Sequence, residues 1–267
     1  MKIPELHGQF ESTHTVFYIA SDEKYFNIYG KPLISSIRAN FSYPIHCHVY
    51  NPSEETLGLC KKIGISVTYE FFNEDLISKA YDFYKFDTIE SEYSRRRSKM
   101  IKLGEDVEKI RTELVRTYYA CARFIRLDQI LSKPTYVIML DTDSLVRKQF
   151  ALPKNNFDIH IFEKTHKKHV PYIQHLASTI FYTGTEGSLE LIKQHSKLIN
   201  EEFDKDTFYW FLDQETLDIV IQKFKKTPLN KQFVDFEMNK NSYIWCAKGP
   251  RKFTKIYLDE IKKYQIL

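Results

Sequence analysis

The fold of this chain is decided by residues 136–143, which read Tyr-Val-Ile-Met-Leu-Asp-Thr-Asp and follow Pro134. The first five form a purely apolar run, which predicts a strand buried on both faces, as in a parallel sheet. Two aspartates follow at once, separated by one residue. Ligands of open α/β sheets collect beyond the carboxyl ends of the strands, so Asp141 and Asp143 are expected to lie in a binding site.

Strand and helix patterns alternate on both sides of this run. Five further stretches have the composition of strands: 15–20, 44–50, 65–69, 158–162 and 178–182. Apolar residues recur at helical spacing in four stretches: 33–41, 105–125, 188–202 and 213–224. Ser53, followed by two glutamates, predicts the capping box of a further helix. The alternation indicates an α/β fold, with a mostly parallel sheet flanked by helices, in one domain of residues 1–267.

The composition is that of an ordinary globular protein. Of its 267 residues, 43% are hydrophobic and 28% charged, which excludes a disordered chain. The net charge of +4 is small for a nucleic-acid binder, although residues 95–97 are three arginines. No apolar run approaches the ~20 residues of a membrane helix, and residues 1–8 lack the apolar core of a signal peptide. We therefore expect a cytoplasmic protein with reduced cysteines and no nucleic-acid partner.

Glycine is scarce in this chain, with 8 Gly against 20 Phe and 18 Tyr. Neither G-x-G-x-x-G nor G-x-x-x-x-G-K-[ST] occurs, which argues against dinucleotide-binding Rossmann and P-loop enzymes. If phosphates bind to this chain, something other than a glycine-rich loop must hold them. Two carboxylates two residues apart can share a hard divalent cation that bridges a diphosphate, so Mn²⁺ or Mg²⁺ is expected on Asp141 and Asp143. A second D-x-D, at 204–206, follows no apolar strand and is expected only to cap or solvate a helix start.

The segment Leu140–Val146 resembles the D-x-D segment of nucleotide-sugar glycosyltransferases with the GT-A fold. Four other segments resemble, in the same order, motifs of glycosyltransferase family 8: 19–25, 118–124, 212–217 and 246–252. The resemblance implies a GT-A fold and an enzyme that retains anomeric configuration. Its donor would be a UDP-linked sugar, and its acceptor a hydroxyl of a glycan or glycolipid.

The resemblance also implies a role for each matching residue. Those expected to bind the nucleotide sugar are Ala20, Ser21, Asp22, Tyr25, Arg123, Asp141, Thr142, Asp143, Gly249 and Lys252. Tyr25 would stack on the base, and Lys252 would hold the diphosphate. Those expected beside the reacting sugar are Asp213 and Gln214. Those expected on the metal are Asp141, Asp143 and Cys246.

Two departures from family 8 keep alternatives open. Cys246 stands where the family has a histidine ligand, and a thiolate is softer than Mg²⁺ or Mn²⁺ prefers. Ala177 begins the segment that in the family reads N-x-G, so the acceptor pocket differs from that of the familiar members. One alternative is an inverting transferase with Asp213 as general base. Another is a degenerate protein of the same fold that binds a glycan or nucleotide without turnover.

Two stretches stand apart from the strand–helix pattern. Residues 73–104 are polar and aromatic, and they predict an insertion or an irregular helical segment. Residues 248–267 mix lysine and arginine with apolar side chains. This basic segment is expected either to be a surface helix docked on the domain or to make peripheral contact with the inner face of an anionic membrane.

Overall fold

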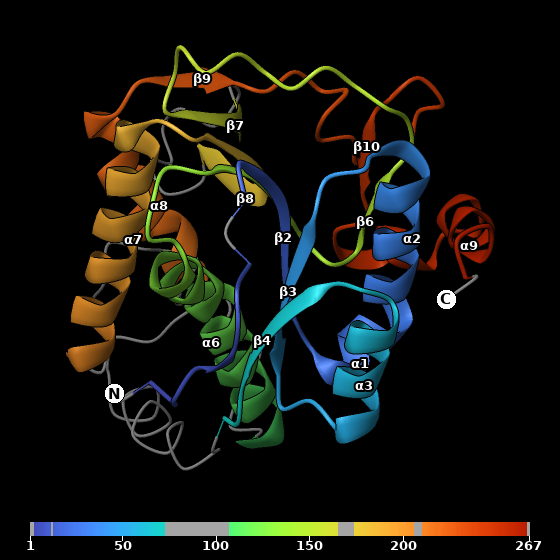
Figure 1. Cartoon of the computed structure of the whole chain (residues 1–267), viewed down its shortest axis with the longest axis horizontal. Coiled ribbons are helices and arrows are strands. Elements are labelled where there is room, and N and C mark those ends of the chain that lie inside the picture. Colours follow the sequence, from blue (N-terminus) through green and yellow to red (C-terminus); the bar gives the residue numbers. More distant parts are fainter. Residues whose placement is uncertain (1–2, 12, 73–106, 165–173, 206–209, 266–267) are drawn as a thin grey trace.

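The computed structural model of the chain describes residues 3–11, 13–72, 107–164, 174–205 and 210–265. The insertion expected at 73–104, with its three arginines, lies outside them. The described residues form an eight-stranded mixed sheet with helices on both faces (Figure 1). Its strands, in spatial order, are β1 (His7–Gly8), β4 (Ser66–Glu70), β3 (Ile45–Tyr50), β2 (Thr15–Asp22), β5 (Tyr136–Leu140), β8 (His175–Thr183), β7 (Ile159–Glu163) and β9 (Lys226–Pro228).

The centre of the sheet is parallel and its other half is mixed. Strands β4, β3, β2 and β5 run in one direction, whereas β8 runs against both β5 and β7. Ile19 of β2 lies opposite Leu140 of β5, which in turn lies opposite Thr179 of β8. The carboxyl ends of β2 and β5 therefore lie at the same edge of the sheet, and β8 passes this edge beside β5. The predicted α/β class, with a mostly parallel sheet flanked by helices, is confirmed.

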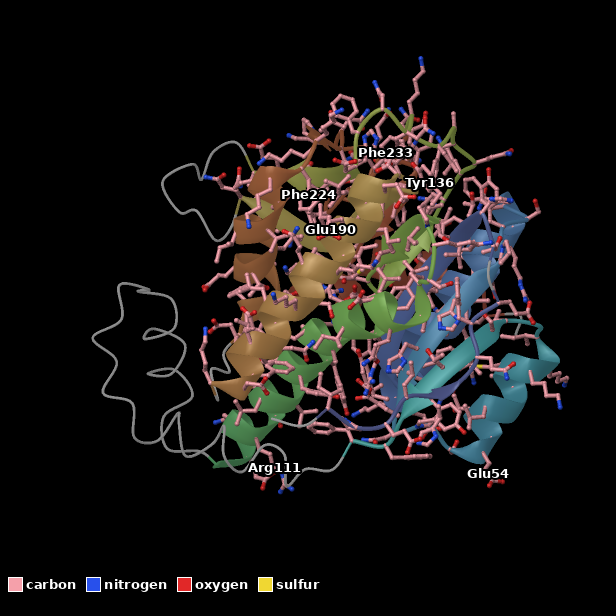
Figure 2. The ribbon with its side chains drawn as sticks, turned by 60° about the vertical axis from the view of Figure 1, so that its left-hand side comes forward. Glu54, Arg111, Tyr136, Glu190, Phe224 and Phe233 are labelled. Atoms are coloured by element: carbon pink, nitrogen blue, oxygen red, sulfur yellow. The ribbon has the colours of Figure 1, made fainter. Side chains whose placement is uncertain are left out.

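The helices form a layer on each face of the sheet. They are α1 (Glu23–Tyr25), α2 (Lys31–Asn40), α3 (Glu54–Lys62), α6 (Val107–Ile130), α7 (Glu186–Asp204), α8 (Leu212–Val220) and α9 (Lys255–Lys262). Helices α6, α7 and α8 pack together on one face, and α2 and α3 cover the other. Figure 2 shows α6 and α7 side by side, with Glu190 marking the outer surface of α7.

Strand β5 contributes to both hydrophobic cores. Val137 and Met139 pack with α6, α7 and α8, whereas Ile138 and Leu140 pack with α2 and α3. Alternate residues of a strand point to opposite faces, so a strand covered on both sides must be apolar throughout. This is why the run from Tyr136 forms the middle of the sheet, as the sequence predicts.

Two local predictions need correction. Ser53 caps α3 by accepting a hydrogen bond from Thr56 N at 3.2 Å. A capping box also needs a glutamate or glutamine at the third residue of the helix, and that residue is Thr56. The Ser53 amide donates instead to the carboxylate of Glu23 in α1, at 2.9 Å. Asp204 of the second D-x-D was expected at a helix start and is instead the last residue of α7; Asp206 is outside the described residues.

A two-stranded sheet was missed by the sequence patterns and proves important for the site. Strand β6 (Ser144–Val146) follows the two aspartates directly and pairs antiparallel with β10 (Ile244–Cys246). The pairing places Cys246, two residues before the basic C-terminal segment, opposite Ser144, which directly follows Asp143. Within the described residues, no helix is both long and apolar enough to cross a bilayer.

Candidate functional site

Asp141, Thr142 and Asp143 form a turn between β5 and β6 that neighbouring strands hold in place. The Asp141 amide donates to the Ser178 carbonyl of β8 at 2.8 Å, and the Ser144 amide donates to the Asp141 carbonyl at 2.9 Å. The Thr142 hydroxyl donates to the Ala20 carbonyl at the end of β2, at 3.1 Å. The Thr142 hydroxyl therefore anchors the turn to β2, and the Asp141 amide anchors it to β8.

Arg123 of α6 joins two of the predicted site carboxylates. Its Nη1 lies 2.5 Å from Asp141 Oδ1, and its Nη2 lies 3.1 Å from Asp213 Oδ2. Burial alone would lower the pKa of Arg123, but the charges of Asp141 and Asp213 outweigh it and raise that pKa above the usual range. The guanidinium is thus a permanent positive charge at the centre of the site.

Asp143 has a separate set of partners from the two ends of the chain. Tyr25 OH donates to Asp143 Oδ2 at 3.0 Å, and Lys252 Nζ lies 3.1 Å from the same oxygen. Lys252 also donates to the Tyr25 hydroxyl. Burial and the neighbouring charge of Asp141 nevertheless raise the pKa of Asp143 above its ordinary value. The two aspartates therefore repel one another in a partly dehydrated site, and their surroundings favour further positive charge.

Asp213 and Gln214 lie at the start of α8, both buried. Phe211 begins this helix with a φ of 82°, which is strained for a bulky residue. Burial raises the pKa of Asp213, while the charges of Arg123 and Lys248 lower it. His195 of α7 donates to the Asp213 carbonyl at 3.0 Å and so holds the helix start against α7. Through Arg123 the structure brings Asp213 next to Asp141 of the D-x-D turn; the role of Gln214 stays a prediction.

The predicted nucleotide segment is a tight turn from β2 into α1. Asp22 caps α1 by accepting from Tyr25 N at 2.9 Å, and the Ser21 hydroxyl donates to the Asp22 carbonyl at 2.8 Å. The centroid of the Tyr25 ring lies 4.7 Å from that of the Tyr29 ring. The Lys252 ammonium also lies 4.7 Å from the centroid of the Tyr25 ring. Stacking of Tyr25 on a base stays a prediction.

Cys246 is buried at the end of β10 and has two hydroxyl partners. Its Sγ lies 3.5 Å from Thr179 Oγ1 and 3.8 Å from Ser144 Oγ. Burial raises the pKa of Cys246 to about 12, so the thiol is protonated at neutral pH. Among the described residues, no three His, Cys, Asp or Glu side chains are grouped to hold a metal ion. The three predicted ligands, Asp141, Asp143 and Cys246, therefore do not form such a group.

The donor atoms of the aspartate pair fit a hard divalent cation. One oxygen of each carboxylate, Asp141 Oδ2 and Asp143 Oδ1, makes no hydrogen bond with any described residue. Mg²⁺ is typically bound by one or two carboxylates together with substrate phosphates and water, and it needs no full set of protein ligands. The two free oxygens suit that kind of site.

Three residues of the site were not found from the sequence. Tyr257 OH of α9 donates to the Asp143 carbonyl at 2.8 Å, and the Ala247 amide donates to the same oxygen at 3.2 Å. Lys248 is close enough for its charge to lower the pKa of Asp213. Nothing in the sequence separates Tyr257 from the other tyrosines or Lys248 from the other lysines of the basic segment. Gly249, with a φ of +67°, makes the turn that follows Lys248.

Comparison with known proteins identifies the fold. No protein-family model matches the sequence, and no curated protein matches it. The crystal structure of the glycosyltransferase GlyE from Streptococcus pneumoniae TIGR4 matches with a TM-score of 0.56 and 11% identity, over 94% of this chain and 61% of GlyE. Its apo form matches with a TM-score of 0.58 and 12% identity, over 96% of this chain and 61% of GlyE. The chain therefore has the fold of the glycosyltransferase GlyE, over 61% of that protein's length.

Proposed function

We propose that this chain is a metal-dependent glycosyltransferase that moves a sugar from a UDP-linked donor to a hydroxyl of a glycan or glycolipid. One observation carries the proposal: Arg123 binds both Asp141, at the end of the central strand, and Asp213, at the start of α8. That contact unites the predicted metal ligands and the predicted reacting centre in one site on a glycosyltransferase fold.

The roles follow from charge and position. Asp141 and Asp143 would hold Mn²⁺ or Mg²⁺, which when bound neutralises the diphosphate and stabilises the leaving group. Arg123 and Lys252 would add positive charge for the same phosphate oxygens. The turn from β2 into α1, with Tyr25, would receive the nucleoside. Fixed charges of this kind stabilise a transition state without rearranging during the reaction.

Retention of configuration is the proposed outcome at the sugar. The Asp213 carboxylate is held by Arg123 at 3.1 Å, which orients it as a fixed negative charge beside Gln214. The alternative is inversion with Asp213 as the general base, which the burial that raises its pKa would favour. The anomer of the product, read by NMR, decides between them: an inverted linkage would rule out retention.

A screen of nucleotide sugars for Mn²⁺-dependent hydrolysis tests the proposal directly. Slow release of free sugar requires no acceptor, so the unknown acceptor is no obstacle. We expect hydrolysis of at least one UDP-sugar, and its loss when EDTA removes the metal. Turnover that persists in EDTA would contradict the metal-dependent mechanism.

A second candidate is a protein of this fold that binds a nucleotide or glycan without turnover. It is favoured by the protonated, hydroxyl-bonded thiol of Cys246, where family 8 has a metal-binding histidine. Calorimetric binding of UDP and Mn²⁺ without hydrolysis of any donor in the screen would support this candidate over the enzyme.

Peripheral contact with an anionic membrane is proposed for the C-terminal segment. Phe253, Ile256 and Leu258 are 70%, 48% and 41% exposed, next to exposed basic side chains such as Lys255. The wild type should sediment with anionic liposomes, and the double variant F253S/I256S should not. The matched control is I219S, which removes an equally exposed apolar side chain of α8. A wild type that stays in the supernatant overturns the proposal.

A further inference from the structure

Lys252 forms an ion pair with Asp143, one of the two proposed metal ligands. Its ammonium lies 3.1 Å from Asp143 Oδ2 and also donates to the Tyr25 hydroxyl, which itself donates to the same oxygen. The tyrosine rings of Tyr25 and Tyr29 lie 4.7 Å and 5.6 Å from the ammonium. Lys252 thus has a defined place beside Asp143, stabilised by a carboxylate and by the faces of two aromatic rings.

Arg123 and Lys252 are held very differently in the site. Arg123 is shared between Asp141 and Asp213, and its Nε also donates to the Ala120 carbonyl at 3.1 Å. Lys252 contacts only one carboxylate among the described residues. A divalent cation bound to Asp143 would repel an ammonium at this distance, because like charges in a partly dehydrated site are poorly screened. A cation on the free Asp143 Oδ1 would therefore weaken the hold of the same carboxylate on Lys252, which contacts no second carboxylate among the described residues.

The local backbone allows that movement. Lys252 lies in a short turn at Gly249–Phe253 that begins with Gly249 at a φ of +67°. Among the described residues, apart from its chain neighbours, none packs against the side-chain position of Gly249, and Phe253 on the other side of Lys252 is 70% exposed. The lysine side chain is itself a flexible four-carbon stem ending in a point charge. A change of rotamer takes the ammonium away from Asp143 and ends its contacts with the Tyr25 and Tyr29 rings.

We infer that Lys252 and the divalent cation compete for Asp143, and that a nucleoside diphosphate ends the competition by giving the ammonium phosphate oxygens to bind. Lysine binds phosphate as a point charge, so the exchange requires no fixed geometry. This inference rests on the proposed function and adds a regulation to it: metal and nucleotide bind cooperatively because one lysine is exchanged between them. Without metal, the ammonium of Lys252 balances the negative charge of Asp143.

Mn²⁺ binding, measured by electron paramagnetic resonance of the free ion, tests this without relying on activity. Wild type, K252M and K255M are each titrated with and without UDP. Lys255 is the matched control, because it is an exposed lysine three residues further along the chain. Without UDP, K252M is expected to bind Mn²⁺ about fivefold more tightly than wild type, the lower end of the usual coupling between two ligands of one protein. The gain in Mn²⁺ affinity caused by UDP should shrink by a similar factor, and K255M should match wild type.

The outcomes separate this inference from the proposed function. Equal or weaker Mn²⁺ binding by K252M without UDP overturns the exchange, even when the wild type binds Mn²⁺ and UDP. The variant K252Q repeats the test with a polar side chain, so a folding defect of K252M cannot decide the result. Absence of Mn²⁺ binding by the wild type, with and without UDP, contradicts the metal site and with it the proposed function.

Discussion

Asp141 and Asp213 share a single counter-ion. The two terminal nitrogens of the Arg123 guanidinium bind one carboxylate each, at 2.5 Å and 3.1 Å, although the aspartates come from the end of β5 and the start of α8. Only a planar fork with several donors can bind two carboxylates in fixed directions. The contact thereby sets the spacing between the proposed metal site and the proposed reacting centre.

Replacement of Arg123 by lysine keeps the charge but removes the fork. R123K is expected to lower donor hydrolysis by about 100-fold, as does loss of one oriented donor to a transition state. Arg116 on the same helix is exposed, so R116K is the matched control and should be active. Steady-state hydrolysis with circular dichroism of both variants measures this. Wild-type turnover in R123K would show that the spacing is set by other contacts.

Replacement of Asp143 removes a proposed metal ligand. D143N should lower donor hydrolysis by at least about 100-fold, because the charge that balances the diphosphate is lost with the ion. D204N changes the other D-x-D, at the exposed end of α7, and should leave hydrolysis unchanged. Equal activity of the two variants would remove the D-x-D interpretation.

Removal of the Tyr257 hydroxyl tests the link from α9 to the D-x-D turn. Y257F loses the hydrogen bond of 2.8 Å to the Asp143 carbonyl, at an expected cost of about 1 kcal/mol in the free energy of unfolding. The Ala247 amide still satisfies that carbonyl, so the cost should not be larger. Urea unfolding measures it, with Y264F as the control. A stability equal to that of wild type would mean that the hydrogen bond contributes nothing net.

Buried His46 should make the protein less stable in mild acid. Burial, with a smaller effect of His48, lowers the pKa of His46 to about 3. Below pH ~6.5 the unfolded chain gains a proton that the folded protein does not, so stability falls by about 1 kcal/mol per pH unit until the folded pKa is reached. The H46N variant has no imidazole at this position and therefore lacks this pH-dependent loss of stability. Its deficit in the free energy of unfolding relative to wild type should therefore shrink between pH 7.5 and pH 5.5 in urea titrations; a constant deficit would contradict the assignment.

The sequence predicted the central strand well because its signal is local. The apolar run ends at Leu140 and two carboxylates follow, so both the strand and its site lie in adjacent residues. Strands β6 and β10 have three residues each and depend on a partner about one hundred positions away, so no periodicity reveals them. Short strands formed by distant pairing leave no pattern of their own.

The sequence pointed to candidate site residues, but it could not show the contacts between them. Resemblance pointed to Arg123 and Lys252, yet their carboxylate partners are fixed by how α6 and the C-terminal segment pack on the sheet. The left-handed backbone of Phe211 could not be predicted, because glycine and asparagine usually occupy that conformation. Lys248 carries the same charge as its neighbours, and only the fold brings it near Asp213.

The hydrogen bond from Tyr257 to the Asp143 carbonyl has a consequence for how the protein is made. The two residues are 114 positions apart, so the turn that carries the aspartates is synthesised long before its last support. A chain that stops short of α9 contains every described strand of the sheet, but its D-x-D turn lacks this anchor. The turn therefore receives its last hydrogen bond only when the final helix has been synthesised.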